Sequence, residues 1–259
     1  MKKQNEFNDF LALAIKTTET AGNIVMSDFE NASGFTVKPD GTLVTETDIK
    51  LDKLIKKSIL NAYPEHNIFS EESEKVNNNS EYTWFIDPLD GTHNFIYGLP
   101  LFAVSIALSF RDKMIVGVVH IPVIKRTYYA CRGYGAFVNG KRISVSTRSE
   151  QTIISHDASL SKDTGQKLRI IRDMVKKAIK RLRILGSACV SLSFVASGVF
   201  DAYVSQDIKP YDIAAGCLIV EEAGGKVTDF KGGPWTPYTE KIIASNGLIH
   251  DKILGILSA

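Results

Sequence analysis

The stretch Trp84-Phe85-Ile86-Asp87-Pro88-Leu89-Asp90-Gly91-Thr92 places two carboxylates, separated by a rigid dipeptide, directly after three apolar residues. Every second residue from Tyr82 to Ile86 is apolar, which is typical of one face of a buried strand. Because proline cannot donate a hydrogen bond to a neighbouring strand, we expect the strand to end near Asp87. Gly91 permits a sharp turn, and Thr92 then opens a short helix whose free N–H groups favour an anion. Two acids at a strand end that face a helix N-terminus suit a metal-bridged phosphate.

The composition sets limits on the class of protein. A chain of 259 residues, 44% of them hydrophobic, can bury a sizeable core in one large domain or two small ones. The net charge of +2 is too small to indicate a nucleic-acid partner, and no apolar run approaches the roughly 20 residues of a membrane span. The segment Met1–Glu6 leads into an amphipathic pattern and not into a signal region. Cys131, Cys189 and Cys217 are odd in number and lack metal-ligand spacing, so we predict reduced structural thiols in a cytoplasmic protein.

Helical and strand patterns alternate along the chain. Apolar residues at helical spacing predict helices at about residues 6–30, 48–59, 168–182 and 212–223, and a closing helix from about residue 247. β-rich runs predict strands at 68–69, 102–110, 114–120, 128–130, 136–138, 153–154, 199–204 and 242–244. The turn Arg111-Asp112-Lys113 joins two of these strands as a hairpin.

One expected helix, within residues 162–183, has a strongly basic outer face. Its apolar stripe consists of Leu168, Ile171, Val175, Ala178, Ile179 and Leu182, and its outer face of Lys167, Arg169, Arg172, Lys176, Lys177, Lys180 and Arg181. A basic helix can indicate nucleic acid or anionic lipid, but here no aromatic residues are interleaved and the rest of the chain is balanced in charge. We therefore predict a solvated face, with no nucleic-acid and no membrane partner.

Several charged residues admit both a structural and a functional interpretation. Lys38 precedes a Pro-Asp-Gly turn and is either a solvated loop lysine or a cation for phosphate. Asp48 and Asp212 stand at helix starts, where an aspartate usually caps the helix. Glu71 and Glu72 follow a short strand, as either a solvated turn or a cation site. Because adjacent residues on extended backbone point in opposite directions, the two glutamates cannot ligate one ion symmetrically.

The block Asp-Pro-Leu-Asp-Gly-Thr at residues 87–92 resembles the signature of the inositol monophosphatase family of magnesium-dependent phosphatases. Three further blocks match in the family's order: Val44-Thr45-Glu46-Thr47-Asp48, Ser70-Glu71-Glu72-Ser73 and Tyr211-Asp212-Ile213-Ala214-Ala215-Gly216. The resemblance implies an α+β fold, a layered αβαβα sandwich in one compact unit. It places most metal ligands in an N-terminal half at residues 1–145, and the substrate pocket with Asp212 in a C-terminal half at residues 146–259.

By this resemblance, the metal ligands are Glu71, Asp87, Asp90, Asp212 and the carbonyl of Leu89. Magnesium prefers such oxygens, and no Cys/His cluster stands near them, so Mg²⁺ is expected, with Mn²⁺ as a substitute. One ion at Glu71, Asp87 and the Leu89 carbonyl would lower the pKa of a bound water. A second at Asp87, Asp90 and Asp212 would stabilise the leaving oxygen. The family's third, weaker ion would lie near Glu71.

The resemblance also assigns residues around the ions. Asp48 would hold the Thr92 hydroxyl, which orients the nucleophilic water. Glu72 would lie next to the metal ligands and support them without binding an ion directly. The N–H groups of Gly91 and Thr92 would hold phosphate oxygens. Lys38 stands where the family often carries a lysine.

The expected substrate pocket lies in the second half of the chain. Leu185-Gly186-Ser187-Ala188 is a strand-to-helix turn, and in the family the matching residues Gly186, Ser187 and Ala188 form part of the pocket together with Asp90 and Asp212. Inositol-hydrolysing members carry a glutamate seven residues before the final aspartate, where this chain has Ser205. The segment Lys209-Pro210-Tyr211-Asp212 resembles the histidinol-phosphatase branch somewhat more.

The predicted function is a Mg²⁺-dependent phosphomonoesterase that acts on a small phosphorylated metabolite, a polyol or sugar phosphate similar to inositol 1-phosphate. The alternatives are histidinol phosphatase, fructose-1,6-bisphosphatase, nucleotide 3′-phosphatase, or a non-catalytic member that binds phosphorylated ligands. The resemblance further implies a lithium-sensitive enzyme and a homodimer.

Overall fold

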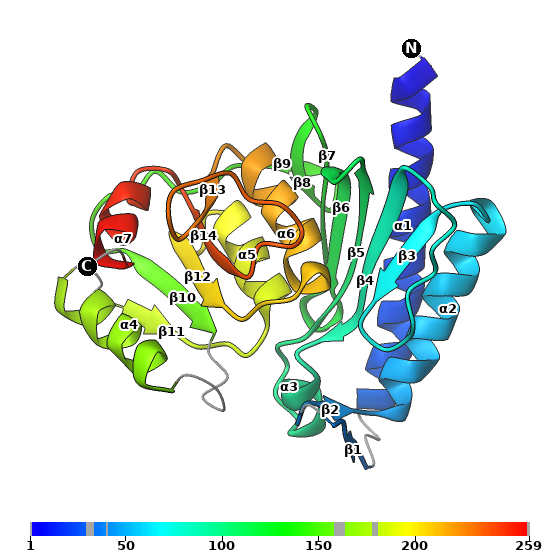
Figure 1. The fold of residues 1–259 in the computed structure, drawn as a ribbon, viewed down its shortest axis with the longest axis horizontal. Coiled ribbons are helices and arrows are strands. Elements are labelled where there is room, and N and C mark those ends of the chain that lie inside the picture. Colours follow the sequence, from blue (N-terminus) through cyan, green and yellow to red (C-terminus); the bar gives the residue numbers. More distant parts are fainter. Residues whose placement is uncertain (1, 30–33, 40, 158–163, 178–180, 258–259) are drawn as a thin grey trace.

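The computed structural model describes residues 2–29, 34–39, 41–157, 164–177 and 181–257. Five layers stack across the molecule (Figure 1). In order, they are helices α1 (Lys2–Phe29) and α2 (Glu46–Ala62), a seven-stranded sheet, helices α5 (Ala188–Ala196) and α6 (Pro210–Glu222), a five-stranded sheet, and helices α4 (Thr164–Lys177) and α7 (His250–Leu257). The order αβαβα confirms the layered α+β fold expected from the sequence.

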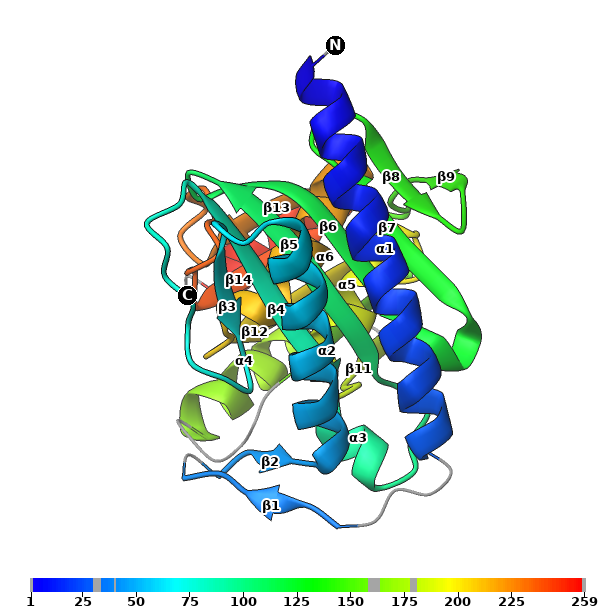
Figure 2. The same ribbon diagram turned by 90° about the vertical axis from the view of Figure 1, so that its right-hand side faces the viewer.

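The seven-stranded sheet is formed by the first half of the chain. Its strands, in spatial order, are β3 (Asn67–Ser70), β4 (Tyr82–Asp90), β5 (Ala103–Phe110), β6 (Lys113–Ile121), β7 (Arg126–Cys131), β8 (Gly135–Val138) and β9 (Lys141–Ile143). β3 and β4 are parallel, and every other neighbouring pair is antiparallel. A separate hairpin of β1 (Thr36–Val37) and β2 (Leu43–Val44) lies beside α3 (Thr92–Ile96) at one end of the molecule (Figure 2). The expected hairpin around Arg111 is therefore confirmed, between β5 and β6.

Strand β4, next to the edge strand β3, contributes side chains to two apolar cores, one on each face of the sheet. Trp84 and Ile86 are fully buried in the cluster under α1 and α2, whereas Phe85 between them is fully buried in the cluster that includes α5 and α6. This alternation is the one predicted from the sequence, and burying each such side chain stabilises the fold by about 1.5–3 kcal/mol.

The layer of α5 and α6 lies unusually close to the seven-stranded sheet at Gly117 in β6. A Cβ atom at residue 117 would lie 2.8 Å from the carbonyl oxygen of Ala215 in α6. Only glycine permits this approach without a shift of the helix. The close packing fixes the first turn of α6, and hence Asp212, against the sheet that carries the other acids.

The five-stranded sheet is formed by the second half of the chain. Its spatial order is β11 (Arg181–Arg183), β10 (Ile153–Asp157), β12 (Ala202–Gln206), β14 (Lys241–Ser245) and β13 (Lys226–Asp229). β10 is parallel to both β11 and β12, while β14 is antiparallel to its two neighbours. Parallel β10 and β12 end at the same edge, where Asp157 pairs in register with Ser205. The division into halves at residues 145 and 146 falls in the connection between the two sheets and remains a prediction.

The basic helix differs from the expectation in both length and orientation. It ends at Lys177, and residues 181–183, expected to be helical, form β11 instead; residues 178–180 lie outside the described part. Leu168 and Val175, expected to face inward, are 51% and 54% exposed, whereas Lys167, expected on the outer face, is 1% exposed.

The sequence allowed this error because apolar residues stand in adjacent pairs. Ile170 and Ile171, like Met174 and Val175, give two stripes of equal helical period, and the structure buries Ile170 and Met174. The start of another strand also differs from the expectation. β12 begins at Ala202 and not at residue 199, because the backbone N–H groups of Val199 and Phe200 donate to the carbonyl oxygen of Phe194 in α5, at 2.9 and 3.0 Å, and not to a neighbouring strand. No helix in the described ranges is long and apolar enough to span a membrane.

His250, at the start of α7, predicts an acid-sensitive contact. It is fully buried, with Nδ1 2.8 Å from Ser245 Oγ and Nε2 2.9 Å from Thr228 Oγ1, and burial lowers its pKa to about 4. An unfolded histidine titrates near 6.5, so the unfolded state binds more protons between these values and stability falls as pH falls through them. Between pH 7.5 and 5 we expect His250 to account for a loss of about 2 kcal/mol. Urea titrations should therefore give His250→Gln a shallower pH dependence than the wild type; identical slopes would contradict this.

Candidate active site

Strand β4 runs to Asp90, three residues past the end predicted at Asp87. The strand continues through Pro88 because its register against β5 shifts between Asp87 and Asp90, so that a bulge accommodates the proline without requiring its missing N–H. Within the bulge the N–H of Leu89 donates to Asp87 Oδ1 at 3.2 Å. The irregular strand end thereby holds two buried carboxylates at one edge of the sheet.

Gly91 makes the turn from β4 into the short helix α3. It has φ of +90° and acts as the N-cap of α3. A Cβ atom here would lie 2.8 Å from the carbonyl oxygen of Leu101. In α3, Asn94 Nδ2 donates to the carbonyls of Leu101 at 2.6 Å and Leu185 at 2.7 Å, which ties the turn to the second half of the chain.

Substituting Gly91 with alanine is expected to destabilise the fold by about 2–3 kcal/mol, since left-handed backbone strain and a backbone clash add. Gly98 is a matched control, because it also has positive φ, of +73°, but a Cβ there meets nothing within 4 Å. Urea unfolding should show a clearly larger loss for Gly91→Ala than for Gly98→Ala. Equal losses would mean that the clash with Leu101 is relieved at no cost.

The acids predicted as metal ligands converge on one cavity. Glu71, Asp87, Asp90 and Asp212, together with Leu89, line a cavity of about 170 Å³. They come from the end of β3, the end of β4 and the first turn of α6. Carboxylates far apart in the sequence thus share one space.

The proximity of these carboxylates perturbs their titration. Burial raises the pKa of Asp87 and of Asp212 well above the usual aspartate range, and the Glu71 carboxylate adds to the rise in both. Burial also raises the pKa of Asp90 to about 6, although hydrogen bonds from Ser187, Cys189 and Ala188 oppose the rise. Carboxylates behave in this way when they share a site without a compensating cation.

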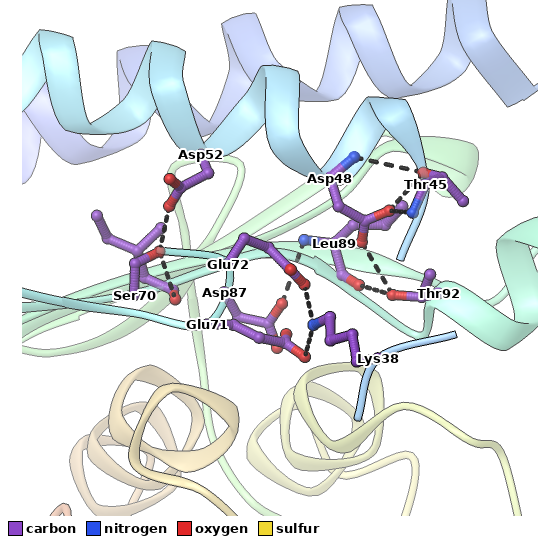
Figure 3. A network of polar contacts seen from close by, with 11 residues as sticks. Lys38, Thr45, Asp48, Asp52, Ser70, Glu71, Glu72, Asp87, Leu89 and Thr92 are labelled. Atoms are coloured by element: carbon purple, nitrogen blue, oxygen red, sulfur yellow. Dashed lines mark hydrogen bonds and ion pairs between the residues drawn. The ribbon is translucent and has the colours of Figure 1, made fainter. Parts of the chain in front are cut away.

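Lys38 reaches the acid cluster from the loop after β1 (Figure 3). Its Nζ lies 2.6 Å from Glu72 Oε1 and 3.3 Å from Glu71 Oε1, and its side chain is only 20% exposed. Burial raises the pKa of Glu72 to about 7, against the opposing hydrogen bond from Lys38. Although burial alone lowers the pKa of Lys38, the two glutamates outweigh it and raise that pKa. Lys38 is thus an ion-pair partner of the site and not a solvated loop lysine.

Asp48 has a structural contact and a site contact at the same time (Figure 3). Its Oδ2 accepts the backbone N–H of Thr45 at 2.8 Å and the Thr45 hydroxyl, which completes the capping box of α2. Its Oδ1 lies 3.0 Å from Thr92 Oγ1, which is also 3.0 Å from the carbonyl oxygen of Leu89. The contact between Asp48 and Thr92 is the one that the family resemblance implies.

Asp90 joins the two halves of the site. Its carboxylate accepts the Ser187 hydroxyl, the N–H of Ala188 at 3.2 Å and the N–H of Cys189 at 2.9 Å. These groups form the start of α5, where Ser187 is the N-cap. The expected pocket residues Gly186, Ser187 and Ala188 are thereby held beside the acid cluster.

A second, larger cavity of about 460 Å³ adjoins the first. The two share lining residues, namely Thr42, Asp90, His93, Gly186 and Asp212. Ser187, Ala188 and Ser205 also line the larger cavity. The Ser205 hydroxyl, however, donates to the carbonyl oxygen of Asp157 at 3.3 Å, so it is engaged within the protein.

One cysteine, Cys189, lies beside the acids, which the sequence analysis did not predict. Its Sγ and carboxylate oxygens of Asp87 and Asp90 lie within 4.8 Å of one another. Burial, with the charges of Asp90 and Asp87, raises the pKa of the thiol well above its usual value, so it stays protonated, and it donates to the carbonyl of Asp212 at 3.4 Å. A protonated thiol is a poor ligand beside hard oxygen donors.

Several residues of the larger cavity escaped the sequence analysis, chiefly Asp157, Lys167, Tyr203 and Gln206. Asp157 could have been found, because an acid at the carboxyl end of a parallel strand faces a ligand-binding edge. The predicted strand at residues 153–154 stopped short of it, whereas β10 ends at Asp157. Lys167 was missed because the apolar stripe of its helix was placed on the wrong face.

Comparison with known proteins agrees with this geometry. The model of the inositol monophosphatase family matches residues 7–259. The chain is 37% identical to "Fructose-1,6-bisphosphatase/inositol-1-monophosphatase" of Thermotoga maritima, over 96% of each chain, and 34% identical to "Inositol monophosphatase" of Dictyostelium discoideum, over 96% and 95%. Its structure superimposes on the extragenic suppressor protein suhB of Bartonella henselae with a TM-score of 0.92, at 32% identity over 96% and 98%. The chain therefore belongs to the inositol monophosphatase family, and it is a phosphomonoesterase of that family.

Proposed function

We propose that this enzyme hydrolyses the phosphate ester of a small polyol or sugar, similar to inositol 1-phosphate, in a Mg²⁺-dependent reaction. The observation that carries the proposal is the convergence of Glu71, Asp87, Asp90 and Asp212 on one cavity. A second cavity, large enough for a leaving group, opens directly beside it.

The donor set fits magnesium. Four carboxylates and the Leu89 carbonyl are hard oxygen ligands, and the raised pKa values of Asp87 and Asp212 indicate repulsion that a cation would relieve. We infer that Glu71, Asp87 and the Leu89 carbonyl hold one ion, and that Asp87, Asp90 and Asp212 hold a second; a third near Glu71, and replacement by Mn²⁺, follow from the family. When bound, such ions activate water and stabilise negative charge on the phosphate.

The remaining residues position water and phosphate. The Thr92 hydroxyl carries one proton, so donating it to Asp48 leaves its lone pairs free to accept from a water aimed at phosphorus. Gly91 and Thr92 line the same cavity, and their backbone N–H groups would hold phosphate oxygens. The ion pair between Lys38 and Glu72 lies beside Glu71 and influences the charge of the Glu71 carboxylate.

The identity of the ester is tested by a screen. Phosphate release should be measured as kcat/KM, with Mg²⁺ and with EDTA, for inositol 1-phosphate, histidinol phosphate, fructose 1,6-bisphosphate, NADP and 3′-phosphoadenosine 5′-phosphate. We expect inositol 1-phosphate to rank first. The dual name of the Thermotoga maritima relative makes fructose 1,6-bisphosphate the leading alternative. Magnesium-independent release, or release from none of these esters, would contradict the proposal and favour a member that only binds phosphorylated ligands.

Family membership also leads us to propose lithium sensitivity and a homodimer. Lithium would compete for a weakly held magnesium position, so phosphate release should fall when lithium chloride replaces sodium chloride at constant ionic strength. Turnover that is unchanged by this exchange would contradict the proposed sensitivity. Sedimentation velocity would test the dimer.

A further inference from the structure

We propose that Asp52 in α2 is a positioning residue of the active site. Through Ser70 it fixes the start of the segment Ser70–Ser73 (the glutamate segment), which carries Glu71 into the acid cluster. This inference rests on the proposed function, in which Glu71 binds a metal ion. Asp52 is not among the described residues that line either cavity, so it acts through Ser70 and not by touching the ion.

Glu71 stands where the chain leaves the seven-stranded sheet. β3 and β4 are parallel, and Ser70 pairs in register with Ile86, so the next residues along the two strands are Glu71 and Asp87. The N–H of Glu71 donates to the carbonyl oxygen of Ile86 at 3.2 Å. Beyond it, within the described part of the chain, no hydrogen bond between backbone groups holds residues 72–75. The direction of the glutamate segment therefore depends on side-chain contacts.

The first of these contacts joins Asp52 to Ser70 (Figure 3). The two residues are 4% and 6% exposed, and the Ser70 hydroxyl donates to Asp52 Oδ1. Because successive side chains on extended backbone point to opposite faces, a Ser70 side chain anchored toward α2 directs Glu71 to the other face of the sheet. On that face, Asp212 at the start of α6 lines the same cavity as Glu71.

The face of α2 that carries Asp52 makes two further contacts around the site. One turn earlier, Asp48 Oδ1 lies 3.0 Å from Thr92 Oγ1, and one turn later, Lys56 Nζ donates to Ser73 Oγ at 2.7 Å. α2 thus holds both ends of the glutamate segment and also the hydroxyl that we assign to water positioning. One rigid helix thereby sets the spacing between a metal ligand and the attacking water.

Loss of the contact between Asp52 and Ser70 should weaken metal binding. Residues that hydrogen-bond to metal ligands or orient them typically change metal affinity or activity 10- to 100-fold when they are removed. Asp52 orients Glu71 through one intervening residue, and the cost of burying its carboxylate is offset by the hydrogen bond from Ser70. A purely structural role would instead lower stability and leave metal affinity unchanged.

The test measures Mn²⁺ binding to the full-length chain without substrate, from the electron paramagnetic resonance signal of free Mn²⁺. It compares wild type with Asp52→Ala, Asp52→Asn, Ser70→Ala and Ile55→Val. Alanine at residue 52 removes the acceptor, asparagine keeps an acceptor oxygen, and Ser70→Ala removes the donor of the same contact. Ile55→Val is the control for a weakened helix, because Ile55 is fully buried in α2 and the loss of one methylene costs about 0.5–1.5 kcal/mol.

In Asp52→Ala and Ser70→Ala we expect the Mn²⁺ dissociation constant to rise about 10- to 100-fold for the ions that Glu71 would bind, while the other proposed ion keeps its affinity. Asp52→Asn should stay within about threefold of wild type, because the hydrogen bond is retained. Ile55→Val should lose stability and bind Mn²⁺ as the wild type does.

Three results would overturn the positioning role and leave the phosphatase intact. They are wild-type affinity in Asp52→Ala or Ser70→Ala, equal losses in the alanine and asparagine variants of residue 52, and a loss in Ile55→Val as large as in Asp52→Ala. A wild type that binds no Mn²⁺ would overturn the proposed metal site itself, and this inference with it. Because the measurement needs no ester, its outcome does not depend on which substrate the enzyme hydrolyses.

Discussion

Replacing Asp87 with asparagine is expected to lower kcat/KM for phosphate release at least 1,000-fold, equivalent to about 4 kcal/mol of lost transition-state stabilisation. Asp87 is 1% exposed, and we place it on both ions. Asparagine preserves the shape, including an oxygen for the N–H of Leu89, but removes the charge that two cations would share. Steady-state phosphate release at saturating Mg²⁺ measures the effect.

The same substitution should have the opposite effect on stability without metal. Because burial and neighbouring carboxylates disfavour the charged form of Asp87, removing that charge should raise the melting temperature in EDTA at pH 8. The stabilisation that Mg²⁺ gives the wild type should shrink in the variant. Asp229→Asn is the control, since Asp229 accepts loop N–H groups and is not among the described residues that line either cavity, so it should change neither readout. An active Asp87→Asn enzyme would refute the assigned role.

Thr92→Val is expected to lower kcat about 100- to 1,000-fold with little change in KM, because valine has the shape of threonine but cannot position water. The hydroxyl lies 3.0 Å from Asp48 Oδ1, so Asp48 fixes its rotation. Thr92→Ser, which restores the hydroxyl, should recover activity to within about tenfold of wild type. Parallel kcat and KM measurements on all three proteins make the comparison.

Two outcomes would count against this role for Thr92. If valine and serine lowered kcat equally, the methyl packing and not the hydroxyl would matter. If Thr92→Val raised KM alone, Thr92 would bind phosphate without positioning water.

The sequence was sufficient to predict the structure where a single physical constraint acts on one continuous segment of the chain. The alternation of Tyr82, Trp84 and Ile86 predicted one face of a buried strand, and the structure buries Phe85 in a second core on the opposite face. Blocks resembling one family supplied the acids, which the structure brings together in one cavity. The contact of Asp48 with Thr92 was likewise anticipated, although a cap alone would have explained an aspartate at that helix start.

What the sequence could not give depends on tertiary context. The strand passes Pro88 because a bulge in the pairing with β5 accommodates it, which no local rule reveals. The orientation of α4 was undecidable from period alone, since two apolar stripes compete, and the wrong choice hid Lys167. Gln206 drew no notice because an isolated glutamine carries no motif. Its side-chain amide is buried and has no hydrogen bond among the described residues, and the residue lines the larger cavity, features that only the folded chain reveals.

The most direct test of the account is an anomalous difference map from a crystal of the full-length chain soaked in Mn²⁺. We predict at least two peaks in the cavity lined by Glu71, Asp87, Asp90 and Asp212, with carboxylate oxygens of Asp87 in contact with both. Peaks confined to other parts of the surface, or a cavity without anomalous density at saturating Mn²⁺, would contradict the claim that these four acids form one divalent-cation site.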